Sequence, residues 1–156
     1  MTLSFAIALV LHQLASLIWV GGMFFAHVAL RPTLAARLEP GPRLSVALGV
    51  FERFFPWVRG AIAILWLSGL WIFLGVMGAE AGLHVHLMMG IAALMTAIFA
   101  VIDLRYFRRL RLRVAAADWP AAAAAFAWIR RLMATNLVLG LGTVMVASGG
   151  LRLLGA

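Results

Sequence analysis

Four long apolar segments without a single charged side chain dominate this sequence of 156 residues. Each has at least the roughly 20 residues that an α-helix needs to cross a hydrocarbon core of about 30 Å. Soluble domains are roughly 45–50% apolar. This chain is 65% hydrophobic and only 12% charged. The sequence therefore predicts an all-α integral membrane protein, one domain over residues 1–156, with a bundle of four transmembrane helices at about 3–30, 60–78, 83–102 and 132–151.

The first apolar segment is expected to remain a helix of the working protein. No basic region precedes it, and it is longer than the roughly 7–15 apolar residues of a signal-peptide core. The chain also contains no cysteine, which excludes disulfides, thiolate ligands and iron–sulfur clusters. Any bound metal must therefore use nitrogen, oxygen or thioether ligands.

Arginine alone supplies the positive charge, since the chain contains no lysine and has a net charge of +8. All but one of the arginines lie in two connections, residues 31–59 and 103–131. The positive-inside rule places both connections in the cytoplasm, and both termini and the turn at Glu80 on the outer side. We therefore expect a multi-pass protein of a bacterial-type inner membrane. Its arginines would contact anionic lipid head groups, and no nucleic-acid partner is expected.

The two arginine-rich connections are predicted to be partly helical. Prolines and a glycine at 39–42 break the first connection, and a short interfacial helix at 44–57 then leads into the second span. Residues 106–114 are expected to extend the third helix. Asp118 is a typical N-cap, and the alanines at 121–125 would form the interfacial first turns of the fourth helix.

Two histidines on different predicted spans are expected to lie at the same depth. His12 precedes Arg31 by 19 residues, and His86 precedes Arg105 by 19 residues. At a rise of about 1.5 Å per residue, both imidazoles lie roughly 28 Å from the cytoplasmic markers, near the outer side. The first and third helices of an up-down bundle face each other across the core. Two facing imidazoles there could ligate a haem iron from both sides.

Small side chains beside the histidines would leave room for a flat macrocycle. His86 is followed at helical spacing by Gly90, Ala93 and Ala97. His12 shares its predicted face with several small residues and with Trp19. Such small residues also serve plain helix packing in membranes, so packing stays open as an alternative for each glycine.

The remaining polar residues near the spans have less defined roles. His84 lies about 200° around a helix from His86, so it is either an interfacial group beside the cofactor or the ligand in place of His86. Arg152 is predicted near the haem level and could meet a propionate. His27 is expected at the cytoplasmic interface, and Asn136 is expected to cross-bond another helix. The predicted cofactor-binding residues are His12, His86, His84, Gly90, Trp19 and Arg152.

A mixed imidazole and thioether set offers a different chemistry in the third span. His84, His86, Met88 and Met89 are close in sequence, and such ligands suit copper, Cu(I) in particular. A continuous helix would point the two methionines to different sides, so this copper site is the alternative to haem.

Two sequence stretches resemble known families. "LHQLASLIWVGGMFFAHVALRP" at residues 11–32 resembles the first-span signature of the copper resistance protein D (CopD) family. The same stretch, with "SGLW" at 68–71 and "LHVHL" at 83–87, is similar to the HemJ type of protoporphyrinogen oxidase. The CopD resemblance implies a role linked to copper uptake or tolerance.

The HemJ resemblance implies roles for three histidines. His12 corresponds to that family's first-span histidine, which is implicated in haem binding, and His84 matches the histidine of its His-Val-Lys motif. His86 stands where that family has a functionally important lysine. This departure could supply a second axial ligand while removing whatever the lysine does in porphyrinogen oxidation.

The sequence thus favours a haem b-binding inner-membrane redox protein that serves cytochrome b-like electron transfer or a linked oxidation. The iron ligands would be His12 and His86. The alternatives are a HemJ-type protoporphyrinogen IX oxidase, a copper-binding or copper-transport membrane protein, and a structural subunit without a cofactor. Oxidoreductase activity, the redox partner and a homo-oligomeric state are left open, and membrane lipids are the expected surroundings.

Overall fold

The computed structural model describes residues 2–78 and 81–149, and four long helices contain nearly all of them. Each of the four is long and apolar enough to cross a membrane. We name them helix one, Leu3–Arg37; helix two, Pro40–Met77; helix three, Leu83–Ala115; and helix four, Trp119–Ala147. The prediction of an all-α bundle of four membrane-spanning helices is confirmed.

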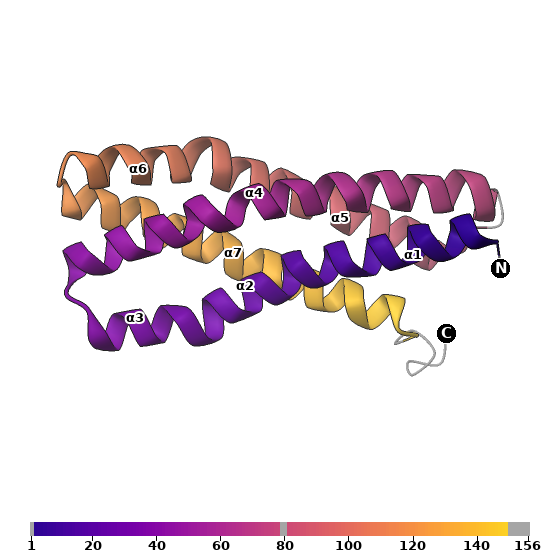
Figure 1. Ribbon diagram of the computed structural model, residues 1–156, viewed down its shortest axis with the longest axis horizontal. Coiled ribbons are helices and arrows are strands. Elements are labelled where there is room, and N and C mark those ends of the chain that lie inside the picture. Colours follow the sequence, from indigo (N-terminus) through magenta and orange to yellow (C-terminus); the bar gives the residue numbers. More distant parts are fainter. Residues whose placement is uncertain (1, 79–80, 150–156) are drawn as a thin grey trace.

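The helices run up and down, so the described chain begins and finishes at one end of the bundle (Figure 1). At this terminal end helix one starts and helix four stops. At the opposite end, which we call the arginine end, lie the two arginine-rich connections. The sequence predicts that the terminal end faces outward, and this orientation stays a prediction. Glu80 and Arg152 lie outside the described residues.

Three of the four helices contain π-helical turns. Helix one comprises α1 Leu3–Ser16, η1 Leu17–Gly21, α2 Gly22–Phe25, η2 Ala26–Leu30 and α3 Arg31–Arg37. Helix two comprises α4 Pro40–Ile72 and η3 Phe73–Met77; helix three comprises α5 Leu83–Val101, η5 Ile102–Phe107 and α6 Arg108–Ala115; helix four is α7 Trp119–Ala147. A π-helical turn bonds each residue to the fifth along. The faces expected from 3.6 residues per turn therefore drift along helix one.

The first connection is shorter than the sequence predicted. Only Leu38 and Glu39 separate α3 from α4, and both have extended ψ angles, 138° and 157°. Pro40 occupies the first turn of α4, where its missing N–H costs no hydrogen bond. Residues 44–57 form no separate interfacial helix, because α4 continues through them and through Pro56 without a break.

The second connection follows the sequence closely. Helix three extends to Ala115, and the side chain of Asp118 caps α7 by accepting a hydrogen bond from the backbone N–H of Ala121 at 3.2 Å. The adjacent alanines were predicted to form interfacial turns, and some of them also belong to the core. Ala122 and Ala125 are buried in the core, because their small side chains let helix four pack closely against helix three.

The packed core lies toward the arginine end and in the middle of the bundle. Its centre is an aromatic cluster in which Phe55 contacts Phe99 and Phe107, with ring centroids 5.4 and 4.8 Å apart. The Asn136 side-chain amide donates to the Met95 carbonyl at 3.0 Å, which confirms the expected cross-helix bond. At the terminal end, in contrast, no described residue is buried within 3–14, 69–78, 81–94 and 141–149.

A charged contact joins helices two and three beside this core. Arg59 donates from Nε and Nη2 to the two carboxylate oxygens of Asp103, both at 2.8 Å. The planar guanidinium thus makes a bidentate interaction with the carboxylate. It fixes the register of the two helices beside the aromatic cluster.

Candidate functional site

His12 is held by a buried serine of the neighbouring helix. Its Nδ1 lies 2.9 Å from Ser68 Oγ, and that hydroxyl donates to the Ile64 carbonyl at 2.6 Å. Because the hydroxyl has only one hydrogen, it accepts from the imidazole Nδ1–H. The tautomer assigned in this way leaves the lone pair on Nε2.

Two adjacent residues of helix two form the surface against which this imidazole packs. Serine in a helix readily bonds back to the carbonyl four residues earlier, and Ser68 is only 7% exposed. Gly69 supplies the space, since a Cβ there would lie 3.2 Å from His12 Cε1. Sequence reasoning treated Ser68 and Gly69 as part of a motif and as small packing residues. A Ser-Gly pair opposite a histidine inside an apolar span is the signal that would have identified them.

His86 approaches the same side of helix two from helix three. Its ring packs edge-on against Phe73 with the centroids 5.5 Å apart, and its Nδ1–H points to the Gly82 carbonyl at 3.3 Å. Gly69 and Phe73 are four residues apart, so they lie on one helix face about 6 Å apart along the axis. The contacts that His12 and His86 make with helix two are therefore about one helical turn apart, at the terminal end of the bundle.

The predicted stripe of small residues beside His86 does not lie between the helices. His86, Gly90, Ala93 and Ala97 are all exposed, and a Cβ at Gly90 would meet nothing within 4 Å. Helix three packs with a different face, which carries Met95, Phe99 and Ile102. Any room beside His86 is therefore on the surface of the described chain.

The other predicted site residues are spread along the bundle. Trp19 is buried in the core, with its ring edge-on to Phe99 at 6.3 Å, about 10 Å toward the arginine end from His12. His84 is exposed in the first turn of α5. His27 lines a pocket near the arginine end. Arg152 is outside the described residues.

The alternative copper ligands stand on one regular helix. Because α5 is helical from Leu83 onward, His84 and Met88 share one face, while His86 and Met89 share another. Each face therefore offers two donors at most. Within residues 2–78 and 81–149, no group of three or more His, Cys, Asp or Glu side chains is arranged to hold a metal ion.

The fold and the apolar helices define a class, the polytopic α-helical membrane proteins. Within this class, the family model of copper resistance protein D (CopD) matches residues 48–149, more than half of the chain. The chain belongs to the CopD family, which links it to copper resistance and confirms that part of the resemblance. Comparisons with curated proteins and with solved structures gave no match. The likeness to HemJ stays a prediction.

The family match covers a different part of the chain from the first-span motif. It begins within α4 and continues to the end of the described residues, so it includes Ser68, Gly69, Phe73 and His86. His12 lies outside the matched range. The family assignment thus rests on helices two to four, and the first-span histidine is connected to them by the contact with Ser68.

Proposed function

We propose that this CopD-family membrane protein binds b-type haem at the terminal end of the bundle, with His12 and His86 as axial ligands through Nε2. It would serve electron transfer or a linked oxidation in the inner membrane. One observation carries the proposal: the hydrogen-bonded chain from His12 to Ser68 to the Ile64 carbonyl. Metal-binding histidines donate their other ring N–H to such an acceptor, which fixes the tautomer and the ring orientation.

Two features of this end of the bundle support a bis-imidazole haem. Both histidines come from different helices, and each has its Nδ1 held by an oxygen atom. No carboxylate or thiolate in the four predicted spans would compete with the imidazoles for the iron. The chain lacks cysteine, and these segments lack acidic residues. The described residues build no protein core at this level, so a large apolar group there would contact side chains that otherwise remain partly exposed.

The chain's own residues would position and tune the ligands. Ser68 keeps the His12 Nδ1 protonated and increases the donor strength of Nε2. Gly69 lets the imidazole approach helix two closely, and Phe73 restrains the ring of His86. The haem would supply one-electron chemistry. Because His86 is exposed, a redox partner in the membrane could reach this side of the site.

The test is an optical spectrum of purified variants. His12→Ala and His86→Ala should each remove the sharp α and β bands of six-coordinate reduced haem. Ser68→Ala should retain haem but shift its midpoint potential, because the ligand loses its hydrogen-bond acceptor. His27→Ala is the matched control, since this histidine lies at the other end of helix one. Unchanged spectra in both ligand variants would overturn the axial assignment.

The family match favours copper as a second candidate. In this case His84, His86, Met88 and Met89 would bind Cu(I). Since each face of α5 provides two donors, a third ligand would have to come from another helix or from a second copy of the chain. This candidate predicts copper without haem, copper loss in Met88→Leu and Met89→Leu, and undiminished copper in His12→Ala. Haem with no bound copper would exclude it.

A further inference from the structure

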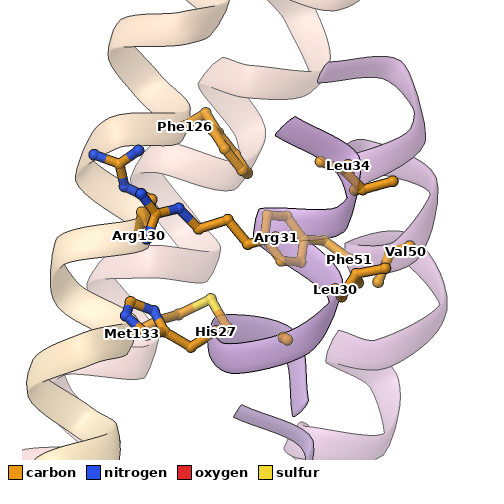
Figure 2. A pocket seen from close by; sticks show the side chains of 11 residues that line it. His27, Leu30, Arg31, Leu34, Val50, Phe51, Phe126, Arg130 and Met133 are labelled. Carbon is orange, nitrogen blue, oxygen red and sulfur yellow. The ribbon is translucent and has the colours of Figure 1, made fainter. Parts of the chain in front are cut away.

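A basic pocket opens between helices one, two and four toward the arginine end. Its cavity volume is about 30 Å³, and it is otherwise open to the surroundings. Arg31 and Arg130 reach it from opposite walls, and His27 lies on the same wall as Arg31 (Figure 2). The rest of its lining is apolar and includes Leu30, Phe51, Phe126 and Met133.

The two arginines that line this pocket, and Arg43, differ from the others in the described chain. Arg31, Arg43 and Arg130 are partly buried, whereas every other described arginine is exposed. The ion pairs within residues 2–78 and 81–149 engage Arg59, Arg111 and Arg113 instead.

The charges that act on Arg130 are also all positive. They belong to Arg31, Arg43 and Arg131. Like charges thus gather where water is partly excluded, and no described carboxylate pairs with them.

An unpaired guanidinium that is partly withdrawn from water is costly unless an anion compensates it. Two guanidinium forks facing one space suit a phosphate, which accepts several charge-assisted hydrogen bonds. The apolar floor contributes nothing to a free inorganic ion. It would, however, bury part of a hydrocarbon chain attached to the phosphate.

The pocket also lies near the expected level of lipid head groups. Exposed tryptophans occur on helix four in this half of the bundle at Trp119 and Trp128, and tryptophans are enriched at membrane interfaces. Basic pockets between transmembrane helices on the cytoplasmic side bind anionic lipids. A lipid phosphate therefore occurs at the depth where these arginines lie.

We propose that this pocket is a specific site for an anionic phospholipid. Its phosphate would lie between Arg31 and Arg130, and its acyl chain would cover Leu30, Phe51 and Met133. The site is separate from the histidines at the terminal end and does not depend on the haem proposal. Its function would be to hold helices one and four together where their arginines repel each other.

The experiment measures lipid retained by the full-length protein. Purified protein is delipidated, incubated with phosphatidylglycerol or phosphatidylcholine, and analysed by native mass spectrometry. The wild type should retain phosphatidylglycerol preferentially. Arg31→Gln with Arg130→Gln should weaken that binding by about 30-fold, because each arginine near an anionic surface contributes about 1 kcal/mol, a factor of about five.

A matched double variant removes the same charge elsewhere. Arg37→Gln with Arg108→Gln alters two exposed arginines outside the pocket, and phosphatidylglycerol retention should remain as in the wild type. Equal weakening in both double variants would show that lipid binding depends on net charge alone, and would contradict a specific site. Equal retention of the two lipids by the wild type would also overturn it.

A second measurement distinguishes binding of a lipid from binding of a free anion. Phosphatidylglycerol should raise the melting temperature of the delipidated wild type, whereas inorganic phosphate and glycerol phosphate at the same concentration should not. The shift should disappear in Arg31→Gln with Arg130→Gln. Equal stabilisation by inorganic phosphate would show a simple anion site and contradict the lipid proposal.

Discussion

Gly22 is the position where one added methyl group should most disturb the bundle. It belongs to α2, and the ring of Phe54 from helix two lies directly over it. A Cβ at Gly22 would overlap the Cζ and Cε2 atoms of that ring. Non-bonded carbon atoms normally remain about 3.5–4.0 Å apart, so either the ring or the helix must move.

The expected cost follows from this overlap. Forcing an extra methyl group into a packed contact typically costs about 1–3 kcal/mol. Gly21→Ala is the matched control, because its Cβ would lie 3.9 Å from Leu17 Cδ1, an ordinary contact. Alanine there gains up to about 1 kcal/mol of helix propensity. The same gain applies to Gly22→Ala, so the two variants should differ in unfolding free energy by the overlap cost alone, about 1–3 kcal/mol.

The assay is reversible unfolding in mixed micelles, followed by far-ultraviolet circular dichroism and tryptophan fluorescence. Phe54→Leu should recover part of the loss when it is combined with Gly22→Ala, whereas alone it should destabilise the protein. A double-mutant cycle measures this coupling. Equal stability of Gly21→Ala and Gly22→Ala, or no coupling with Phe54→Leu, would refute the proposed contact.

Two further predictions use the same unfolding assay. Asn136→Ala removes the bond to the Met95 carbonyl and should cost about 0.6–1.7 kcal/mol, while Thr135→Ala, which loses only a bond within its own helix, should cost less. If the two variants are equally stable, the cross-helix bond contributes nothing. Asp118→Ala should cost about 1 kcal/mol because α7 loses its N-cap, whereas Asp118→Asn retains the cap and loses only the ion pair with Arg113. Equal losses in these two variants would assign the effect to the ion pair.

The architecture could be predicted because the bilayer imposes a strong constraint. A helix that crosses lipid must satisfy its backbone internally and exclude charge, so four uncharged segments predicted four spans. Capping is local in the same way, and Asp118 was identified from its own sequence context. The boundary at 44–57 was missed because an amphipathic segment looks the same whether it lies on the membrane surface or continues a long helix.

Helix rotation could not be predicted from the same information. Counting residues to Arg105 gives the depth of His86 but leaves open which side of helix three meets its neighbours. The large side chains of Met95 and Phe99 bury more apolar surface than Gly90, so they take the packed face. The π-helical turns of helix one also shift the faces that a regular helix would give.

The partner of His12 was likewise hidden in the sequence. Ser68 is 56 residues away along the chain, and its hydroxyl acquires a specific role only when helices one and two pack together. A serine in an apolar span is most often satisfied within its own helix. The contact with the imidazole is therefore a product of tertiary structure.

The most direct test of the account is the reduced-minus-oxidised spectrum of the purified wild-type protein, together with elemental analysis for iron and copper. The haem proposal predicts sharp α and β bands, bound iron and no bound copper. A colourless protein that carries stoichiometric copper, or one that carries neither metal, would contradict a haem site at His12 and His86.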